Sequence, residues 1–168
     1  MSSIFLPSVS LADIKAAKKS SDPNDLYDLL VQPLHEWLYA KGGFEHIEQL
    51  SQGQQLLIAY DYMRMQVGQG GFIQFIHNGY VGLLPDMIEQ LYKLRANEMA
   101  LVLDDVLKVF VLNRELLTKP ATVQEFALLY DELKEFEEID ARFSRLDIMT
   151  VKVMLEYAAG HLNEFIEQ

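Results

Sequence analysis

The sequence contains no cysteine, so it can form neither a disulfide framework nor a metal site built on thiolates. Its histidines do not indicate a metal site either. None of them stands in an H-E-x-x-H pattern or three residues after a glutamate, the spacings of zinc proteases and di-iron bundles. The four histidines are His35, His46, His77 and His161. We therefore expect no metal and no cofactor.

Long apolar runs are absent as well. No stretch reaches the roughly 20 residues that a membrane-spanning helix needs. Residues 1–10 also lack the basic, apolar and small-residue series of a signal peptide. From these two absences we expect a cytoplasmic protein with no membrane partner.

Basic residues are scarce. There are 14 lysines and arginines against 25 aspartates and glutamates, which gives a net charge of -11 and a pI near 4.7. Proteins that bind nucleic acid directly neutralise its phosphates with basic side chains. The charge balance argues against direct nucleic-acid binding. It fits a solvated acidic protein or one whose partner is basic.

Strand-like alternation of apolar and polar residues is missing, whereas helical periodicity runs through most of the chain. With 168 residues, half of them hydrophobic, the chain can bury a sizeable core. We predict a single all-α domain over residues 1–168, with about eight to ten helices, several of them short. Residues 1–9 show neither period and are predicted to be an N-terminal arm.

Capping signals place several helix starts. Ser10 caps the first predicted helix, and two capping boxes follow, formed by Ser51 with Gln54 and by Thr122 with Glu125. Because Pro33 lacks a backbone N–H group, we expect the helix that starts after Asp22 to end near Val31 and another to begin. Further along the chain we expect a buried central helix from Asn97 to about Leu117, a helix from Thr122 to about Arg145, and a last helix from Asp147.

The least generic stretch is GQGGFIQFIHN, from Gly68 to Asn78. Three glycines within four residues would each cost a helix roughly 1 kcal/mol, so we expect the helix that starts at Ser51 to end here and a new one to begin. Phe72 and Phe75 in the new segment are predicted to face the core. His77, with Gln74 and Asn78, is a candidate for a ligand pocket, although a lone histidine near a helix end is more often structural.

Catalytic motifs are not found: there is no G-x-S-x-G elbow, phosphate loop or Rossmann fingerprint. The charge pattern is more informative. Residues 122–140 hold seven acids and one base, Lys134, and so carry a net charge of -6. The candidate partner-binding residues are these acids: Glu125, Asp131, Glu132, Glu135, Glu137, Glu138 and Asp140.

The arrangement of these acids suggests a binding surface. On one continuous helix, Asp131, Glu135 and Glu138 would fall within about 60° of one another, opposite the apolar residues. A row of carboxylates can stand in for phosphates toward the lysines and arginines of a DNA-binding protein. The alternative interpretation is a face kept acidic only for solubility.

The motif G-G-F-x-Q-F-x-x-N resembles the signature of a bacterial family of small helical proteins that includes a DNA mimic. In this chain Gln69 stands where that family is expected to have asparagine. The residues that carry the resemblance are Gly70, Gly71, Phe72, Gln74 and Asn78. Their amides and glycines are expected to be structural, as a turn with its hydrogen bonds.

The resemblance implies a non-catalytic homodimer whose acidic surface occupies the DNA-binding surface of a helix-turn-helix transcription regulator and keeps it off its operator. Two other functions stay open. One is a small-ligand binder or enzyme with a pocket around the GGFIQFIHN motif. The other is an inhibitor or toxin-neutralising protein that turns the same acidic face toward a different basic partner.

Overall fold

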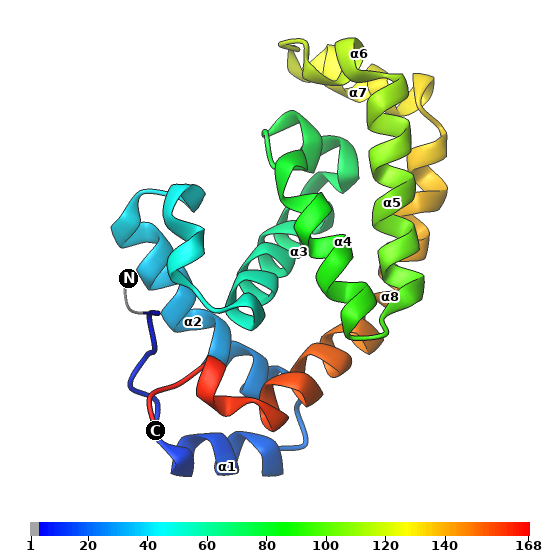
Figure 1. The fold of residues 1–168 in the computed structure, drawn as a ribbon. Coiled ribbons are helices and arrows are strands. Elements are labelled where there is room, and N and C mark those ends of the chain that lie inside the picture. The colour runs from blue at the N-terminus through cyan, green and yellow to red at the C-terminus, as the bar shows by residue number, and fades with distance from the viewer. Residues whose placement is uncertain (1–3) are drawn as a thin grey trace. The chain divides into compact units, whose positions relative to one another are not determined.

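The computed structural model describes residues 4–168, and this part of the chain is helical with no strand. The all-α prediction is therefore confirmed, with eight α-helices and three short 3₁₀ helices among the described residues. Their order along the chain is shown in Figure 1. The elements are α1 (Leu11–Lys19), α2 (Asn24–Lys41), η1 (Phe44–Gln49), α3 (Gln52–His77), η2 (Val81–Leu83), α4 (Leu84–Lys93), α5 (Asn97–Leu112), α6 (Arg114–Thr118), α7 (Val123–Glu132), α8 (Glu135–Gly160) and η3 (Leu162–Glu164).

The helices form two compact units. The first unit comprises residues 4–61 and 151–168, and the second comprises residues 62–150. Helices α3 and α8 each contribute residues to both units. The single-domain assignment stays a prediction. Within the described residues, no helix combines the length and the apolar character needed to cross a membrane.

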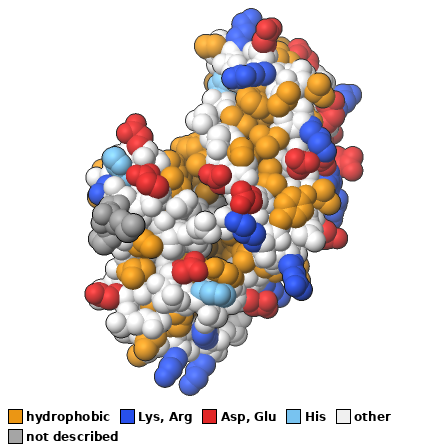
Figure 2. Space-filling model, in the orientation of Figure 1, with side chains coloured by type: hydrophobic (Ala, Val, Ile, Leu, Met, Phe, Trp, Pro, Cys, Tyr) orange, Lys and Arg blue, Asp and Glu red, His pale blue; other side chains and the backbone are white. Residues whose placement is uncertain are grey.

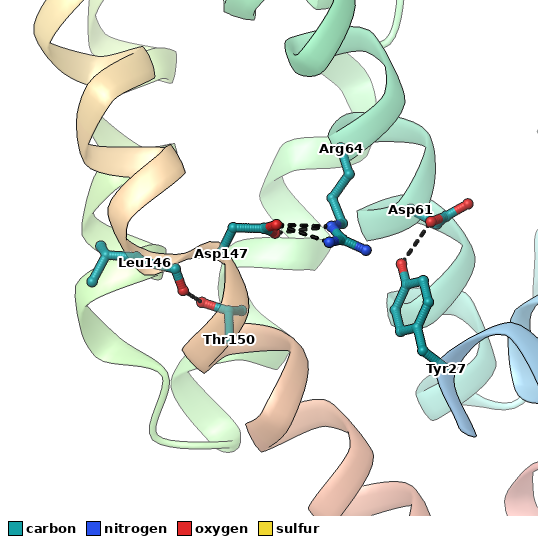
Figure 3. Close-up of polar contacts among 6 residues, drawn as sticks. All are labelled: Tyr27, Asp61, Arg64, Leu146, Asp147 and Thr150. Carbon is teal, nitrogen blue, oxygen red and sulfur yellow. Dashed lines mark hydrogen bonds and ion pairs between the residues drawn. The ribbon is translucent and has the colours of Figure 1, made fainter. Parts of the chain in front are cut away.

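In the first unit, α1 packs on α2 and buries Ile14 against it. The N-terminal segment is attached to this unit, since Phe5 lies 6.0 Å from Trp37 between ring centroids and its N–H group donates to the carbonyl of Gln49 at 3.0 Å. Residues 1–3 of the predicted arm lie outside the described residues. A buried carboxylate also belongs to this unit: Asp61 accepts from the Tyr27 hydroxyl at 2.7 Å (Figure 3) and lies 2.6 Å from the His35 ring.

Three predicted caps are confirmed. The Ser10 hydroxyl accepts from the N–H of Asp13 at the start of α1. At the start of α3, Gln54 N–H donates to the Ser51 hydroxyl while the Gln54 side chain accepts from Ser51 N–H. Thr122 and Glu125 make the same reciprocal pair at α7. Each cap satisfies backbone donors that a helix start leaves unpaired.

The predicted helix end near Val31 is wrong, because α2 continues through Pro33 to Lys41. The proline costs one backbone hydrogen bond, yet Leu30, Val31 and Leu34 on either side of it are all buried. Packing of this apolar face outweighs the local penalty. The predicted stop at the glycine pair is confirmed, since Gly42 adopts a left-handed φ of 79° directly after the last helical residue.

In the second unit, α4 packs on α5 and buries Leu84 and Leu91. A bidentate ion pair between Arg64 and Asp147, with Nε to Oδ1 at 2.9 Å, links α3 to α8 (Figure 3). The predicted central buried helix is only partly correct. It ends at Leu112 rather than near Leu117, and Val111 and Leu112 are exposed, as are other hydrophobic side chains over α5 in Figure 2.

The single helix expected from Thr122 to about Arg145 is also wrong. The chain leaves helical geometry at Leu133, where φ is -111° and ψ is 63°, and α8 then runs from Glu135 to Gly160 without a new start at Asp147. The break places Glu135, Glu137 and Glu138 in the first turn of α8, where the helix dipole favours carboxylates. In a continuous helix the same acids would have stood mid-helix, without this favourable interaction with the helix dipole.

Candidate partner-binding site

Six of the seven predicted acids are exposed on α7 and on the first turn of α8. Because the helix breaks at Leu133, the structure does not place Asp131 on one stripe with Glu135 and Glu138, as a continuous helix would have done. Asp131 lies instead at the C-terminal end of α7, and Glu135 and Glu138 lie at the N-terminal end of α8. We call the exposed set the acidic face, and it consists of Glu125, Asp131, Glu132, Glu135, Glu137 and Glu138.

The acidic face carries uncompensated charge. Within the part of the chain that the structure describes, no ion pair involves any of its six carboxylates. One of them, Glu125, accepts from the N–H of Thr122 in the capping box at 2.9 Å. The surface therefore presents its negative charge to solvent rather than neutralising it internally.

The seventh acid, Asp140, has a different environment. It is only partly exposed, and its Oδ1 accepts from the backbone N–H of Phe72 at 3.0 Å. Burial raises the pKa of its carboxyl, while the hydrogen bond from Phe72 acts in the opposite direction. Asp140, one of the predicted partner-binding residues, is thus hydrogen-bonded to Phe72 of the GGF motif, a contact that the sequence pattern did not predict.

The double-glycine break is confirmed. Inside α3, Gly70 has φ and ψ of -156° and 21°, and Gly71 has 71° and -175°, so the helical path is interrupted and resumes at Phe72. Gly71 is the residue that requires glycine, because its positive φ disfavours any side chain. As predicted, Phe72 and Phe75 are fully buried. Phe72 packs edge-on against Phe143 of α8, with ring centroids 5.5 Å apart.

Tyr130 of α7 forms the second connection to this break. Its hydroxyl donates to the carbonyl of Gly70. Burial and the neighbouring Asp140 carboxylate raise the pKa of Tyr130 to about 12, so its hydroxyl stays a protonated donor at physiological pH. Tyr130 was not predicted as a site residue, because nothing in its sequence spacing marks it as the partner of a glycine 60 residues away.

The motif amides make a local hydrogen-bonded cluster. Gln66 Oε1 accepts from Asn78 Nδ2 at 2.6 Å and from Gln74 Nε2 at 3.3 Å. Gln69 Oε1 accepts from Gln74 Nε2 at 3.1 Å. The amides thus bridge the two halves of α3 across its break. Gln69, which stands at the expected asparagine position, takes part, whereas Gln66 was not singled out by the sequence.

His77 lies at the end of α3, partly buried, with its ring edge-on to Phe126 of α7 at a centroid distance of 5.4 Å. His77, Gln74 and Asn78 do not line the open hollow of about 270 Å³ beside Leu101 and Arg142, nor that of about 590 Å³ beside Lys18 and Lys152. No group of three or more metal-binding side chains lies close enough together among residues 4–168 to hold an ion. The observed roles of these motif residues are therefore packing and hydrogen bonding.

A family model described as "DMP19-like protein" matches residues 48–161, a range that includes the glycine break, the amide cluster and the acidic face. The chain belongs to the DMP19-like protein family. The family is that of DNA mimic protein 19, which confirms the resemblance to DNA-mimic proteins. A search of the curated proteins found no match. The matched range of this DMP19-like chain thus contains both the glycine motif and the acidic face.

Proposed function

We propose that this protein is a non-catalytic DNA mimic whose acidic face binds the DNA-binding surface of a helix-turn-helix transcription regulator and blocks operator binding. The observation that carries the proposal is the acidic face itself: six exposed carboxylates that make no ion pair within residues 4–168, in a chain of a DNA-mimic family. The proposal includes a homodimer as the binding form and excludes direct contact of this protein with nucleic acid.

The charge density of the face is higher than an even distribution would give. The chain exposes 9689 Å² and carries a net charge of -11. A typical interface footprint of about 800 Å² would then hold about one unit of negative charge. The acidic face holds six carboxylates within 14 residues of sequence, opposed by one lysine, Lys134. Such clustering steers and retains a basic partner.

The placement of two of these acids opposes local stability. Asp131 and Glu132 are the last two residues of α7, and no basic residue lies in the last turn of that helix. The partial negative charge at a helix C-terminus disfavours carboxylates there, by about 0.3–1 kcal/mol each. Solubility alone could be served by acids at any exposed position. Their placement at this helix end supports a binding role for the surface.

The partner chemistry follows from the same surface. A regulator that binds operator DNA presents lysines and arginines spaced to meet phosphates. The carboxylates of the acidic face offer such a surface the same charge without a base sequence to read. Binding would depend on charge and would weaken as salt rises, because the Debye length falls from about 10 Å at 0.1 M to about 3 Å at 1 M ionic strength.

The test is affinity capture from lysate of the source cell with wild type and a variant that combines Asp131→Lys, Glu135→Lys and Glu138→Lys. The matched control combines Glu45→Lys, Glu156→Lys and Glu167→Lys, which makes the same change in net charge at exposed positions of the first unit. Circular dichroism checks that all three chains keep their helical content.

We expect wild type and control to capture a DNA-binding regulator that operator DNA or salt releases, and the acidic-face variant to lose it. Capture of a basic protein that does not bind DNA would point instead to an inhibitor of another target. Equal capture of the regulator by all three chains would contradict the proposal.

A further inference from the structure

We propose that Tyr130 and Asp140 are positioning residues that fasten α7 and α8 to the double-glycine break of α3, and so set the geometry of the acidic face without touching the partner. The inference concerns the same surface and rests on the proposed function for its biological role. It assigns the family motif a task in partner binding, and it removes Asp140 from the residues that meet the partner directly.

The two fastenings lie on opposite sides of the break between α7 and α8. Tyr130 donates to the carbonyl of Gly70 and directly precedes Asp131 of the acidic face. Asp140 accepts from the N–H of Phe72 and follows Glu138 by two residues. The backbone of the glycine break thus provides one acceptor for α7 and one donor for α8.

The break is suited to this role because its backbone polar groups are available. Gly70 and Gly71 leave helical geometry, so the Phe72 N–H is directed to a side chain of another helix. A Cβ atom on Gly71 would overlap both the Tyr130 hydroxyl and the Asp140 carboxylate. Only a residue without a side chain lets the two groups approach the same point of the backbone.

Apolar contacts hold the same three helices together around these polar contacts. Leu133, at the helix break, and Phe136, in the first turn of α8, are buried, and Phe143 packs on Phe72. Phe126 packs on His77 at the end of α3. Apolar packing is non-directional, whereas the two hydrogen bonds have defined donors and acceptors. They therefore fix the orientation of the acid-bearing segments more narrowly than the packing does.

A structural role for Asp140 is also indicated by its environment. An acid whose task was to meet a basic partner would be expected at full exposure, as its six neighbours are. Asp140 is instead placed where burial disfavours its charge, and its oxygen is engaged with the backbone. What this position requires is a hydrogen-bond acceptor of the right length. Asparagine provides the same acceptor without the charge.

The absence of cysteine allows a direct measurement of this geometry. We would introduce Gly68→Cys on α3 and Ala127→Cys on α7, both exposed, attach nitroxide labels and record the distance distribution by pulsed electron resonance. A Cβ at Gly68 meets nothing within 4 Å, so the label site is tolerated. The Phe72 amide is followed by hydrogen exchange in the same chains. The variants are Asp140→Ala, Asp140→Asn and Tyr130→Phe, with Asp86→Ala as the control at an exposed acid of α4.

We expect Asp140→Ala to broaden the label distance distribution about twofold and to speed exchange at Phe72 by about tenfold, because a hydrogen bond of modest net worth is lost. Tyr130→Phe, which removes only a hydroxyl and retains the ring packing, should broaden the distribution as well. Asp140→Asn and Asp86→Ala should match wild type in both readouts. Wild-type distributions in Asp140→Ala and Tyr130→Phe would overturn the positioning role.

Capture of the regulator separates this inference from the proposed function. If Asp140 positions the face, Asp140→Asn should retain capture within about twofold, whereas Asp140→Ala should lose it by about tenfold or more. Equal loss in both variants would show that the charge of Asp140 meets the partner, and would overturn the inference while the mimic function stands. Should wild type capture no regulator, the label and exchange results still decide the positioning role.

Discussion

The carboxylates of α5 and those of the acidic face are treated in opposite ways. On α5, Asp104 and Asp105 lie 3.1 and 3.9 Å from the Lys108 ammonium group, and Asp105 also accepts from Arg142 of α8 at 2.6 Å. On α7 and the start of α8, six acids have no such partner within the described chain. One region neutralises its charge within the fold, and the other leaves it directed outward.

The difference shows what an uncompensated acidic surface needs from its scaffold. Where acids are paired, α5 continues without interruption for 16 residues. Where acids are unpaired, the helix stops at Leu133 and starts again at Glu135, and the two pieces are fastened to α3 through Tyr130 and Asp140. The acids of α5 are neutralised by Lys108 of the same helix and by Arg142 of α8, whereas the segments that carry the acidic face contact α3 through Tyr130 and Asp140, neither of which belongs to that face.

The largest expected effect is that of a substitution at Gly71, where Tyr130 of α7 and Asp140 of α8 approach the backbone of α3. Gly71→Ala should lower the free energy of unfolding by about 3 kcal/mol, because its left-handed φ strains any side chain and its Cβ would overlap Tyr130 and Asp140. Urea denaturation measures the loss. The control Gly68→Ala, in open space on the same helix, should be neutral or stabilising by up to about 1 kcal/mol. Equal stability of the two variants would refute the requirement for glycine at position 71.

A smaller effect is expected on the paired side. Arg142→Ala should cost about 1 kcal/mol, the upper range for a partly exposed ion pair, since it leaves Asp105 without its shortest contact. Lys134→Ala, which removes the one base of the acidic segment, should change stability by less than about 0.5 kcal/mol. Thermal unfolding of both variants checks the contrast. A larger loss for Lys134→Ala would mean that the acidic face is compensated after all.

The pH dependence of stability should distinguish the partly buried Asp140 from the six exposed acids of the acidic face. Burial raises its pKa above the ordinary value of 3.8, so the folded state binds protons more readily than the unfolded state does. The contribution of Asp140 to the free energy of unfolding of wild type should therefore fall as the pH rises from about 4 through the folded pKa. Asp140→Asn lacks this titration. Its stability relative to wild type should rise over that window and then level off; a flat or falling difference would contradict the assigned burial.

The smallest effect concerns the two helix ends that carry the acidic face, the C-terminal end of α7 and the first turn of α8. Asp131→Asn at the C-terminal end of α7 should raise the free energy of unfolding by a few tenths of a kcal/mol, because it relieves an unfavourable charge at the helix dipole. Glu137→Gln in the first turn of α8 should lower it by a similar amount. Denaturation at low ionic strength resolves both. Opposite signs support the helix break at Leu133, and a continuous helix would not give them.

Those parts of the fold that depend on neighbouring residues in sequence, the helix caps and the buried helix faces, were predicted correctly. The capping residues Ser10, Ser51 and Thr122 and the buried faces around Phe72 and Phe75 could be read from spacing. The helix break at Leu133 could not, because Leu133 and Phe136 fit a helical apolar stripe equally well. The continuation of α2 through Pro33 was likewise decided by packing on both sides of the proline, which no local rule includes.

The sequence predicted which acids form the candidate site, but not which residues hold it in place through contacts with α3. The charge count identified the acidic segment, and six of its seven acids lie at the surface. That Asp140 turns toward Phe72 depends on a contact 68 residues away in sequence, and Tyr130 depends on a similar one. Such pairs become visible only once α3, α7 and α8 are placed together.

The most direct measurement of the central claim is a competition experiment with the captured regulator. Labelled operator DNA would be titrated with wild type, the acidic-face variant and the first-unit control at fixed ionic strength. Mimicry predicts that wild type and control displace the operator completely, that the acidic-face variant does not, and that no ternary complex forms. A stable complex of regulator, operator and this protein together would contradict the account, because it would place the protein outside the DNA-binding surface.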